Sequence, residues 1–190
     1  FTTGGEHAIS GVWATMSDYW RPGELFKLNA ADGAVLWTDP FAYATTPPIT
    51  GRGGLVFVGA TGVSTHLNPG QLVAEGNVKA YRGDGPLAGT LAWSTTTRYM
   101  PQDLFAGDDG NVYAVGGDGA TGEIYVLDQL TGLLKLTITG VTSPLEIMLR
   151  DGVIYAVGES AVTAIQLPDG LAFNYDPQSS WPVRQHDNQR

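Results

Sequence analysis

The feature that most constrains the fold is a short segment that occurs four times, a glycine followed by alternating apolar and aromatic residues. The four copies begin at glycines 11, 54, 110 and 152, which are 43, 56 and 42 residues apart. Aromatic and β-branched residues in short runs behind a glycine turn are typical of strands. A period near 40–45 residues is typical of repeats that contain four strands each. The sequence therefore predicts an all-β chain of four related units.

A second shared element follows each of these strands and contains a glycine flanked by two apolar segments. In three units a polar residue precedes this glycine by four positions, and in the second unit the turn is three residues longer. The four glycines are Gly33, Gly89, Gly132 and Gly170. This pattern predicts a hairpin in which an Asn or Asp such as Asp128 caps its own backbone and the glycine takes a positive φ.

The hairpin element ends on a tryptophan in the first two units, at Trp37 and Trp93. A polar residue, a glycine four positions later and a tryptophan four positions after that resemble the tryptophan-docking motif of quinoprotein-like β-propeller repeats, the pyrroloquinoline-quinone type. The resemblance covers nearly the whole chain as four degenerate copies, and it implies that each tryptophan packs between neighbouring blades. Leu136 and Asn174 replace the tryptophan later, so the resemblance implies that these blades are held together differently. The segment from Trp181 to Asp187 resembles a Trp-Pro-x-x-x-x-Asp sequence found at the edge of such propellers.

The resulting fold prediction is a β-propeller of four-stranded antiparallel blades, an architecture like that of WD40 repeats. The four predicted blades cover residues 8–51, 52–107, 108–149 and 150–190. They form either a single domain or part of a larger ring, for example of eight blades. We expect the terminal blades to pair with other polypeptide, either the rest of a parent chain or a second copy, because bare edge strands promote aggregation.

Charge and composition exclude several classes of partner and site. The chain has 10 basic and 19 acidic residues, a net charge of −9, so nucleic acid is not an expected partner. It has no apolar run of about 18 residues, so membrane insertion is not expected. It has no cysteine, which excludes disulfides, thiolate metal sites and cysteine catalysis.

Two insertions interrupt the repeat, and residues in such loops often contact ligands. The first, residues 16–24, contains Tyr19, Trp20 and Arg21, and the second, residues 61–77, contains His66. These four residues are the candidates for a rim binding site, and the aromatic pair beside an arginine suits a sugar or a partner protein. The alternative interpretation is that Tyr19 and Trp20 only pack against the blade and cover it, without binding a ligand.

Two further motifs are interpreted as turns. Residues 117–122 match G-x-G-x-x-G, but a strand pattern follows where a dinucleotide site needs a helix, so a hairpin turn is predicted. Asp108, Asp109 and Asp118 lack the spacing of a calcium-binding loop, and solvated turns are predicted there.

The favoured functional hypothesis is a non-catalytic scaffold or protein-interaction module with neither cofactor nor metal. Quinoprotein dehydrogenases resembling this repeat hold their quinone with a vicinal disulfide and calcium, and this chain has no cysteine and no recognisable ligand set. Two alternatives remain: a glycan-binding module that uses the rim loops, and a fragment of a quinone-dependent dehydrogenase. The resemblance implies a location outside the cytoplasm, periplasmic or secreted.

Overall fold

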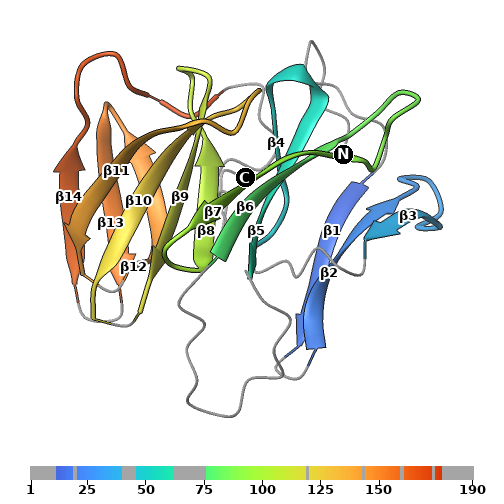
Figure 1. Cartoon of the computed structure of the whole chain (residues 1–190), viewed down its shortest axis with the longest axis horizontal. Coiled ribbons are helices and arrows are strands. Elements are labelled where there is room, and N and C mark those ends of the chain that lie inside the picture. The colour runs from blue at the N-terminus through green and yellow to red at the C-terminus, as the bar shows by residue number, and fades with distance from the viewer. Residues whose placement is uncertain are drawn as a thin grey trace.

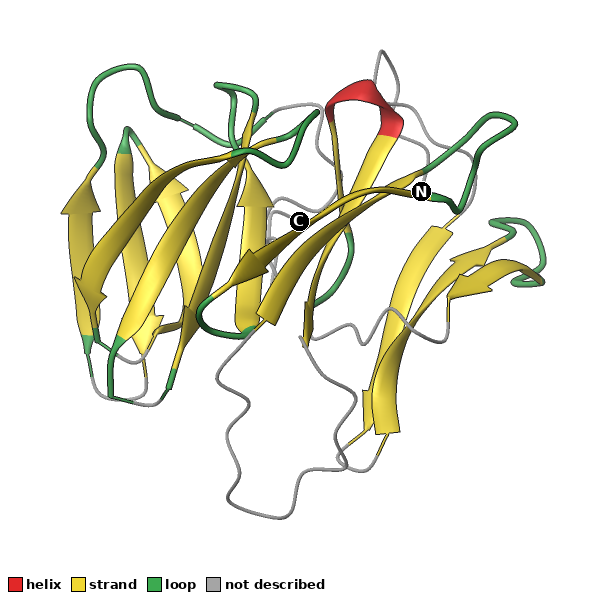
Figure 2. Ribbon diagram, viewed as in Figure 1, coloured by secondary structure: helices red, strands yellow, loops and turns green. Residues whose placement is uncertain are grey.

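The protein is an all-β structure of four antiparallel sheets (Figures 1 and 2), seen in a computed structural model. The structure describes residues 12–18, 21–39, 46–61, 76–118, 120–142, 144–158, 161–172 and 174–176. Within these residues the helical structure is one 3-10 turn, η1 (Arg52–Gly54). No described helix has the length and apolar character needed to cross a membrane.

Strands that are adjacent in sequence pair with one another, so each sheet is an up-and-down meander. The first sheet contains β1 (Val12–Asp18), β2 (Arg21–Leu28) and β3 (Val35–Asp39). The second contains β4 (Ile49–Gly51), β5 (Leu55–Thr61), β6 (Gly76–Arg82) and β7 (Leu91–Thr97). The third contains β8 (Pro101–Ala106), β9 (Asn111–Gly117), β10 (Gly122–Asp128) and β11 (Leu134–Val141). The fourth contains β12 (Pro144–Arg150), β13 (Val153–Gly158) and β14 (Val162–Gln166).

The sheets differ from the predicted units in their boundaries and in their number of strands. Each of the second, third and fourth sheets begins one strand earlier than its unit, with β4, β8 and β12 respectively. The prediction started each unit at its most conspicuous strand, which is the second strand of these sheets. Two sheets have four strands and two have three, and no described strand of the first sheet pairs with one of the fourth, so the described sheets do not close on one another.

The predicted positive φ is present at all four hairpin glycines. The φ angles are +72° at Gly33, +82° at Gly89, +72° at Gly132 and +85° at Gly170. In three units the glycine N–H donates to the carbonyl that closes the turn: Gly33 to Asn29 at 2.8 Å, Gly89 to Arg82 at 2.7 Å and Gly132 to Asp128 at 2.9 Å. Glycine is favoured there because a side chain strains this conformation.

In the described residues that follow β14 the chain does not return to the fourth sheet, contrary to the predicted hairpin. In the first and third units, Asn29 and Asp128 accept the backbone N–H of the residue two positions later. The equivalent positions in the fourth unit are Gln166, whose side chain is one methylene longer, and Pro168, which has no N–H. This local cap therefore cannot form, and the chain crosses to the third sheet, where Tyr175 forms an isolated bridge with Gly107.

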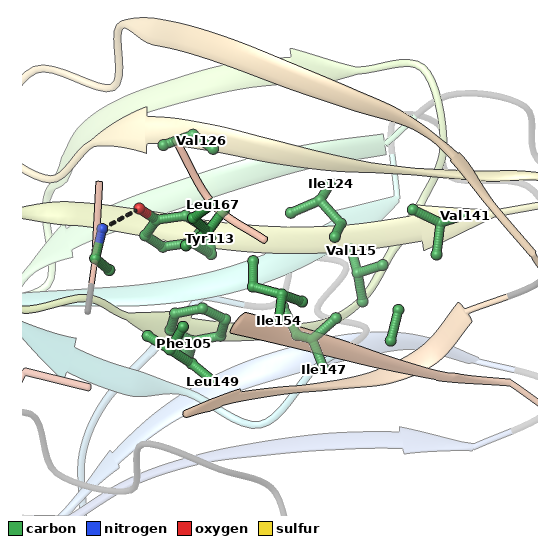
Figure 3. Packing of buried hydrophobic residues seen from close by; sticks show 12 residues of the cluster. Phe105, Tyr113, Val115, Ile124, Val126, Val141, Ile147, Leu149, Ile154 and Leu167 are labelled. Atoms are coloured by element: carbon green, nitrogen blue, oxygen red, sulfur yellow. Dashed lines mark hydrogen bonds between the residues drawn. The ribbon is translucent and has the colours of Figure 1, made fainter. Parts of the chain in front are cut away.

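The core consists of apolar layers between successive sheets. The largest cluster lies between the third and fourth sheets and includes Phe105, Tyr113, Ile124, Ile147 and Ile154 (Figure 3). A second cluster joins the second and third sheets, and a smaller one formed by Leu25, Val58 and Tyr81 joins the first and second. The strands of the third sheet that face both layers, β9 and β10, are buried almost throughout.

Candidate functional site: the junctions between sheets and their outer hairpins

The residues predicted to form a rim binding site lie largely outside the described part of the chain. Tyr19, Trp20 and His66 are not among the described residues, and neither is Trp181. Arg21 is the first residue of β2 and pairs with Asp18 of β1. Strands β1 and β2 therefore occupy most of the segment expected to be an insertion, residues 16–24.

The junction between the first and second sheets is built around Trp37. Its ring lies 5.6 Å from that of Tyr81, and it covers Gly89 so closely that a Cβ on this glycine would enter the indole. The Tyr81 hydroxyl donates to Asp39 Oδ2 at 2.8 Å. Burial, reinforced by this hydrogen bond, raises the pKa of Tyr81, so the phenol remains a donor at neutral pH. A residue of the first sheet thus packs on the hairpin glycine of the second.

Two of the chain's three lysines lie at this same junction. The buried Lys27 amine donates to the Gly83 carbonyl at 2.7 Å and to Asp84 Oδ1 at 2.8 Å, which joins β2 to the β6–β7 turn. Burial lowers the pKa of Lys79 on β6, while the Asp39 carboxylate opposes this shift. Carboxylates thus lie near both amines, which favours a structural role for this charge cluster.

The junction between the second and third sheets repeats the arrangement with Trp93. Its indole Nε1 donates to the Gln129 carbonyl at 3.0 Å, and its ring covers Gly132, where an added Cβ would lie 2.6 Å from Cδ2. Thr95 on the same strand donates to the Gly132 carbonyl at 2.6 Å. The hairpin glycine of the third sheet is therefore held by β7 of the second sheet.

A fully buried amide, Gln129, completes this second junction. Its Oε1 accepts the Arg52 backbone N–H at 2.7 Å, and its Nε2 donates to the Asn111 carbonyl at 3.0 Å. The Arg52 guanidinium also donates to the Asp108 carbonyl at 2.8 Å. Buried polar groups that are paired in this way favour one arrangement of the sheets over others.

The third junction, between the third and fourth sheets, has Leu136 where the earlier sheets have tryptophan, and tyrosines join it instead. Tyr175 packs edge-to-face on Phe105 at 5.1 Å, and its hydroxyl accepts the Leu149 N–H at 2.7 Å. The Tyr113 hydroxyl accepts the Ala172 N–H at 2.9 Å (Figure 3). The segment that leaves the fourth sheet therefore holds these two sheets together.

Two of the three carboxylates predicted to lie in turns accept hydrogen bonds from nearby residues, whereas Asp108 accepts the distant Asn174 N–H at 3.1 Å. Asp109 accepts hydrogen bonds from the side chains of Asn111 and Tyr113, and Asp118 caps the N–H groups of Ala120 and Thr121. Strands β9 and β10 pair from Gly117 to Gly122, so the G-x-G-x-x-G sequence is a hairpin turn, as predicted. The described residues include no group of three or more metal-ligating side chains placed to hold an ion.

Asp128 combines a turn cap with an ion pair. Its Oδ1 accepts the N–H groups of Leu130 and Thr131 at 3.0 Å, and its Oδ2 lies 2.9 Å from Lys135 Nζ. The hydrogen bond from Lys135, together with those from Thr131, lowers the pKa of Asp128 to about 2. Asp128 therefore stays ionised at neutral pH and stabilises the hairpin that faces Trp93.

Exposed apolar side chains recur at one position of the outer hairpins. Val35, Leu91 and Leu134 each lie two residues after the hairpin glycine of their sheet, and they are 59%, 48% and 42% exposed. Each begins the outermost strand of its sheet, β3, β7 or β11. Contiguous exposed apolar patches mark protein-binding surfaces, and these three side chains, one on each of three sheets, are the candidates for such a surface.

Sequence reasoning missed Gln129, Tyr175 and the cluster around Lys79. A sequence signal existed for Gln129, because it directly follows the capping Asp128 in a turn expected to face a tryptophan. For Lys79 and Tyr175 no signal existed, since their partners are 40 and 70 residues away along the chain. Neither comparison with models of protein families nor a search of curated proteins finds a match for this chain.

Proposed function

We propose that the chain is a non-catalytic scaffold of the β-propeller type, in which the four sheets are consecutive blades that present a repeated surface to a partner protein. The observation that carries the proposal is the repeated contact of a tryptophan with the hairpin glycine of the next sheet, Trp37 with Gly89 and Trp93 with Gly132. A contact repeated at equivalent positions fixes neighbouring sheets in a regular series, as a propeller requires.

The polar groups at the junctions support a structural role over a catalytic one. The amines of Lys27 and Lys135 lie within 3 Å of carboxylates, and the buried amide of Gln129 is hydrogen bonded at both of its polar atoms. Such pairing holds side chains in place, whereas a catalytic acid or base must exchange protons with a substrate. By the family resemblance, the proposed scaffold works outside the cytoplasm.

The partner-binding surface in this proposal is the row of exposed apolar side chains Val35, Leu91 and Leu134. The row lies on three outer strands, so a partner that follows it contacts several sheets at once, with a gain in avidity. The expected partner is a protein or further blades of the same architecture. Nucleic acid is not expected, because the chain carries a net charge of −9.

The test is affinity capture from the native source with the wild-type chain and a triple variant, Val35→Thr, Leu91→Thr and Leu134→Thr. The control changes exposed polar residues of the same three strands: Thr38→Ala, Ser94→Ala and Thr139→Ala. The proposal expects a partner that the wild type and the control retain and the triple variant loses. A partner retained equally by all three chains would exclude this surface, and turnover of a substrate by the purified chain would exclude the non-catalytic role.

A further inference from the structure

The outermost strand of each sheet has one edge that no other described strand covers. These strands are β3, β7, β11 and β14. An open edge presents unpaired N–H and C=O groups to any extended chain, and natural sheets block such edges with bulges and charged residues. An outer edge is therefore protected from pairing when its strand carries a bulge or charged side chains.

Three of the four outer edges carry a bulge at the same repeat position. The register shifts lie between Lys27 and Leu28, between Ala80 and Tyr81, and between Val126 and Leu127 on the strand next to the edge. The extra residues on the outer strands are Leu36, Ala92 and Lys135, each three positions after the hairpin glycine. A bulge interrupts the regular spacing of backbone groups and increases the local twist, which discourages a further strand from pairing.

The fourth outer edge, β14, lacks both kinds of protection. Its five residues pair with β13 without a register shift, from Val153 with Gln166 to Val157 with Val162. All five residues, Val162, Thr163, Ala164, Ile165 and Gln166, are uncharged and none is proline. Val162 is 63% exposed, and β14 lies at the end of the fourth sheet, with no described strand beyond it (Figure 1).

Among the described strands, the fourth sheet has none at the position that β7 occupies in the second sheet. β14 follows β12 and β13 as β6 follows β4 and β5, and the second sheet then adds β7. In the fourth unit Gln166 and Pro168 prevent the capped hairpin, and Ala172 and Tyr175 contact the third sheet instead. The repeat thus has a strand at the position next to β14, and the described residues of this unit supply none there.

We propose that this edge pairs with the β14 edge of a second copy of the chain, antiparallel about a two-fold axis at Ala164. In this pairing Ala164 faces Ala164 of the second copy, Thr163 faces Ile165 and Val162 faces Gln166. Two chains of net charge −9 repel each other, and pairing through the uncharged, bulge-free β14 opposes no like charges within the contact. The small side chain at the axis lets the strands approach, and two-fold dimers are the commonest oligomers.

Pairing of two β14 strands joins two three-stranded sheets into one sheet of six strands. The inference does not depend on the proposed function, because the row formed by Val35, Leu91 and Leu134 lies on other strands.

The first test measures mass against concentration by sedimentation velocity for the wild type and for Ala164→Lys, which puts two ammonium groups at the axis. The wild type should approach twice 20.1 kDa, and Ala164→Lys should dissociate with an affinity at least about tenfold weaker. The matched control is Thr139→Lys on β11, also exposed and opposite Glu123 in register, which should dimerise like the wild type. A chain that stays monomeric up to its solubility limit, or a dimer that Ala164→Lys does not weaken, overturns the proposal.

The second test identifies the contact directly. Because the chain has no cysteine, Ala164→Cys introduces a single thiol. Opposed residues of antiparallel strands have Cα atoms about 4.5–5.5 Å apart, a distance that a disulfide spans. Mild oxidation should therefore link two Ala164→Cys chains much faster than two Thr139→Cys chains. Equal rates would show that β14 is not the contact. Ala164 is exposed, and circular dichroism checks that each variant is folded.

Discussion

Trp93 of the second sheet donates its indole N–H to the carbonyl of Gln129 in the third sheet, at 3.0 Å. The same ring covers Gly132, so one side chain supplies both an apolar contact and a polar anchor to the next sheet. Trp37 covers Gly89 of the second sheet in the same manner. The first three sheets are thus held together in series by a residue type and spacing that the sequence repeats.

The two contributions of Trp93 are separable by substitution. Trp93→Phe keeps most of the ring and loses the hydrogen bond to Gln129, so the free energy of unfolding should fall by about 1 kcal/mol. Trp93→Ala also leaves a cavity and should cost about 3 kcal/mol. Urea unfolding at neutral pH measures both. Equal losses for the two variants would mean that the ring does not pack between the sheets.

Asp128→Asn tests the ion pair with Lys135 while keeping the turn cap, since asparagine caps the same N–H groups. The pKa of Asp128 is lowered to about 2, so its contribution is present above pH 4 and is lost as the pH falls towards 2. After allowance for solvent screening, the variant should be less stable than wild type by about 1 kcal/mol at pH 7.

The pH dependence provides the control for Asp128→Asn. The difference in unfolding free energy between the two chains should shrink between pH 4 and pH 2. A difference that stays constant over that range would assign the effect to the turn rather than to the charge.

Tyr175→Phe tests the junction between the third and fourth sheets. The variant leaves the Leu149 N–H without its acceptor and should lower the unfolding free energy by about 1–2 kcal/mol at pH 7. Burial raises the pKa of Tyr175 to about 12, so its contribution is present below pH 10 and is lost as the pH rises towards 12. Chemical unfolding at pH 7, 10 and 11.5 should show the difference between the two chains decreasing. An increase would contradict the burial of this phenol.

Much of the local structure could be predicted from the sequence because it depends on residues close together in the chain. The hairpin glycines and the turn at residues 117–122 follow from local backbone preferences and were predicted. The failure of the fourth hairpin was also encoded locally, by Gln166 and Pro168. The glycine spacing of the repeat nevertheless predicted a hairpin there.

What the sequence could not provide is the pairing of distant residues. Tyr175 packs on Phe105, and Lys27 reaches Asp84, across separations that no local pattern marks. The unit boundaries were misplaced for a related reason. The three-residue β4 is too short to show an alternation of its own, and β8 and β12 lack the leading glycine that marked the start of each predicted unit.

The hypothesis that the chain binds no quinone cofactor is tested by thermal unfolding with pyrroloquinoline quinone and calcium. Because a ligand that binds only the native state must raise its stability, a chain without this site should show an unchanged Tm. Calcium alone and magnesium with the quinone serve as controls. A rise of Tm that grows with quinone concentration would instead support the dehydrogenase-fragment alternative.

The contact of tryptophan with hairpin glycine is tested most directly by comparing Gly132→Ala with Gly33→Ala. Both glycines have φ of +72°, so both variants incur the same backbone strain, about 1–2 kcal/mol. A Cβ at Gly33 meets no atom within 4 Å, whereas at Gly132 it lies 2.6 Å from Trp93. Overpacking should therefore make Gly132→Ala less stable than Gly33→Ala by about a further 1–3 kcal/mol in urea unfolding. Equal losses for the two variants would contradict the docking of Trp93 on the next sheet.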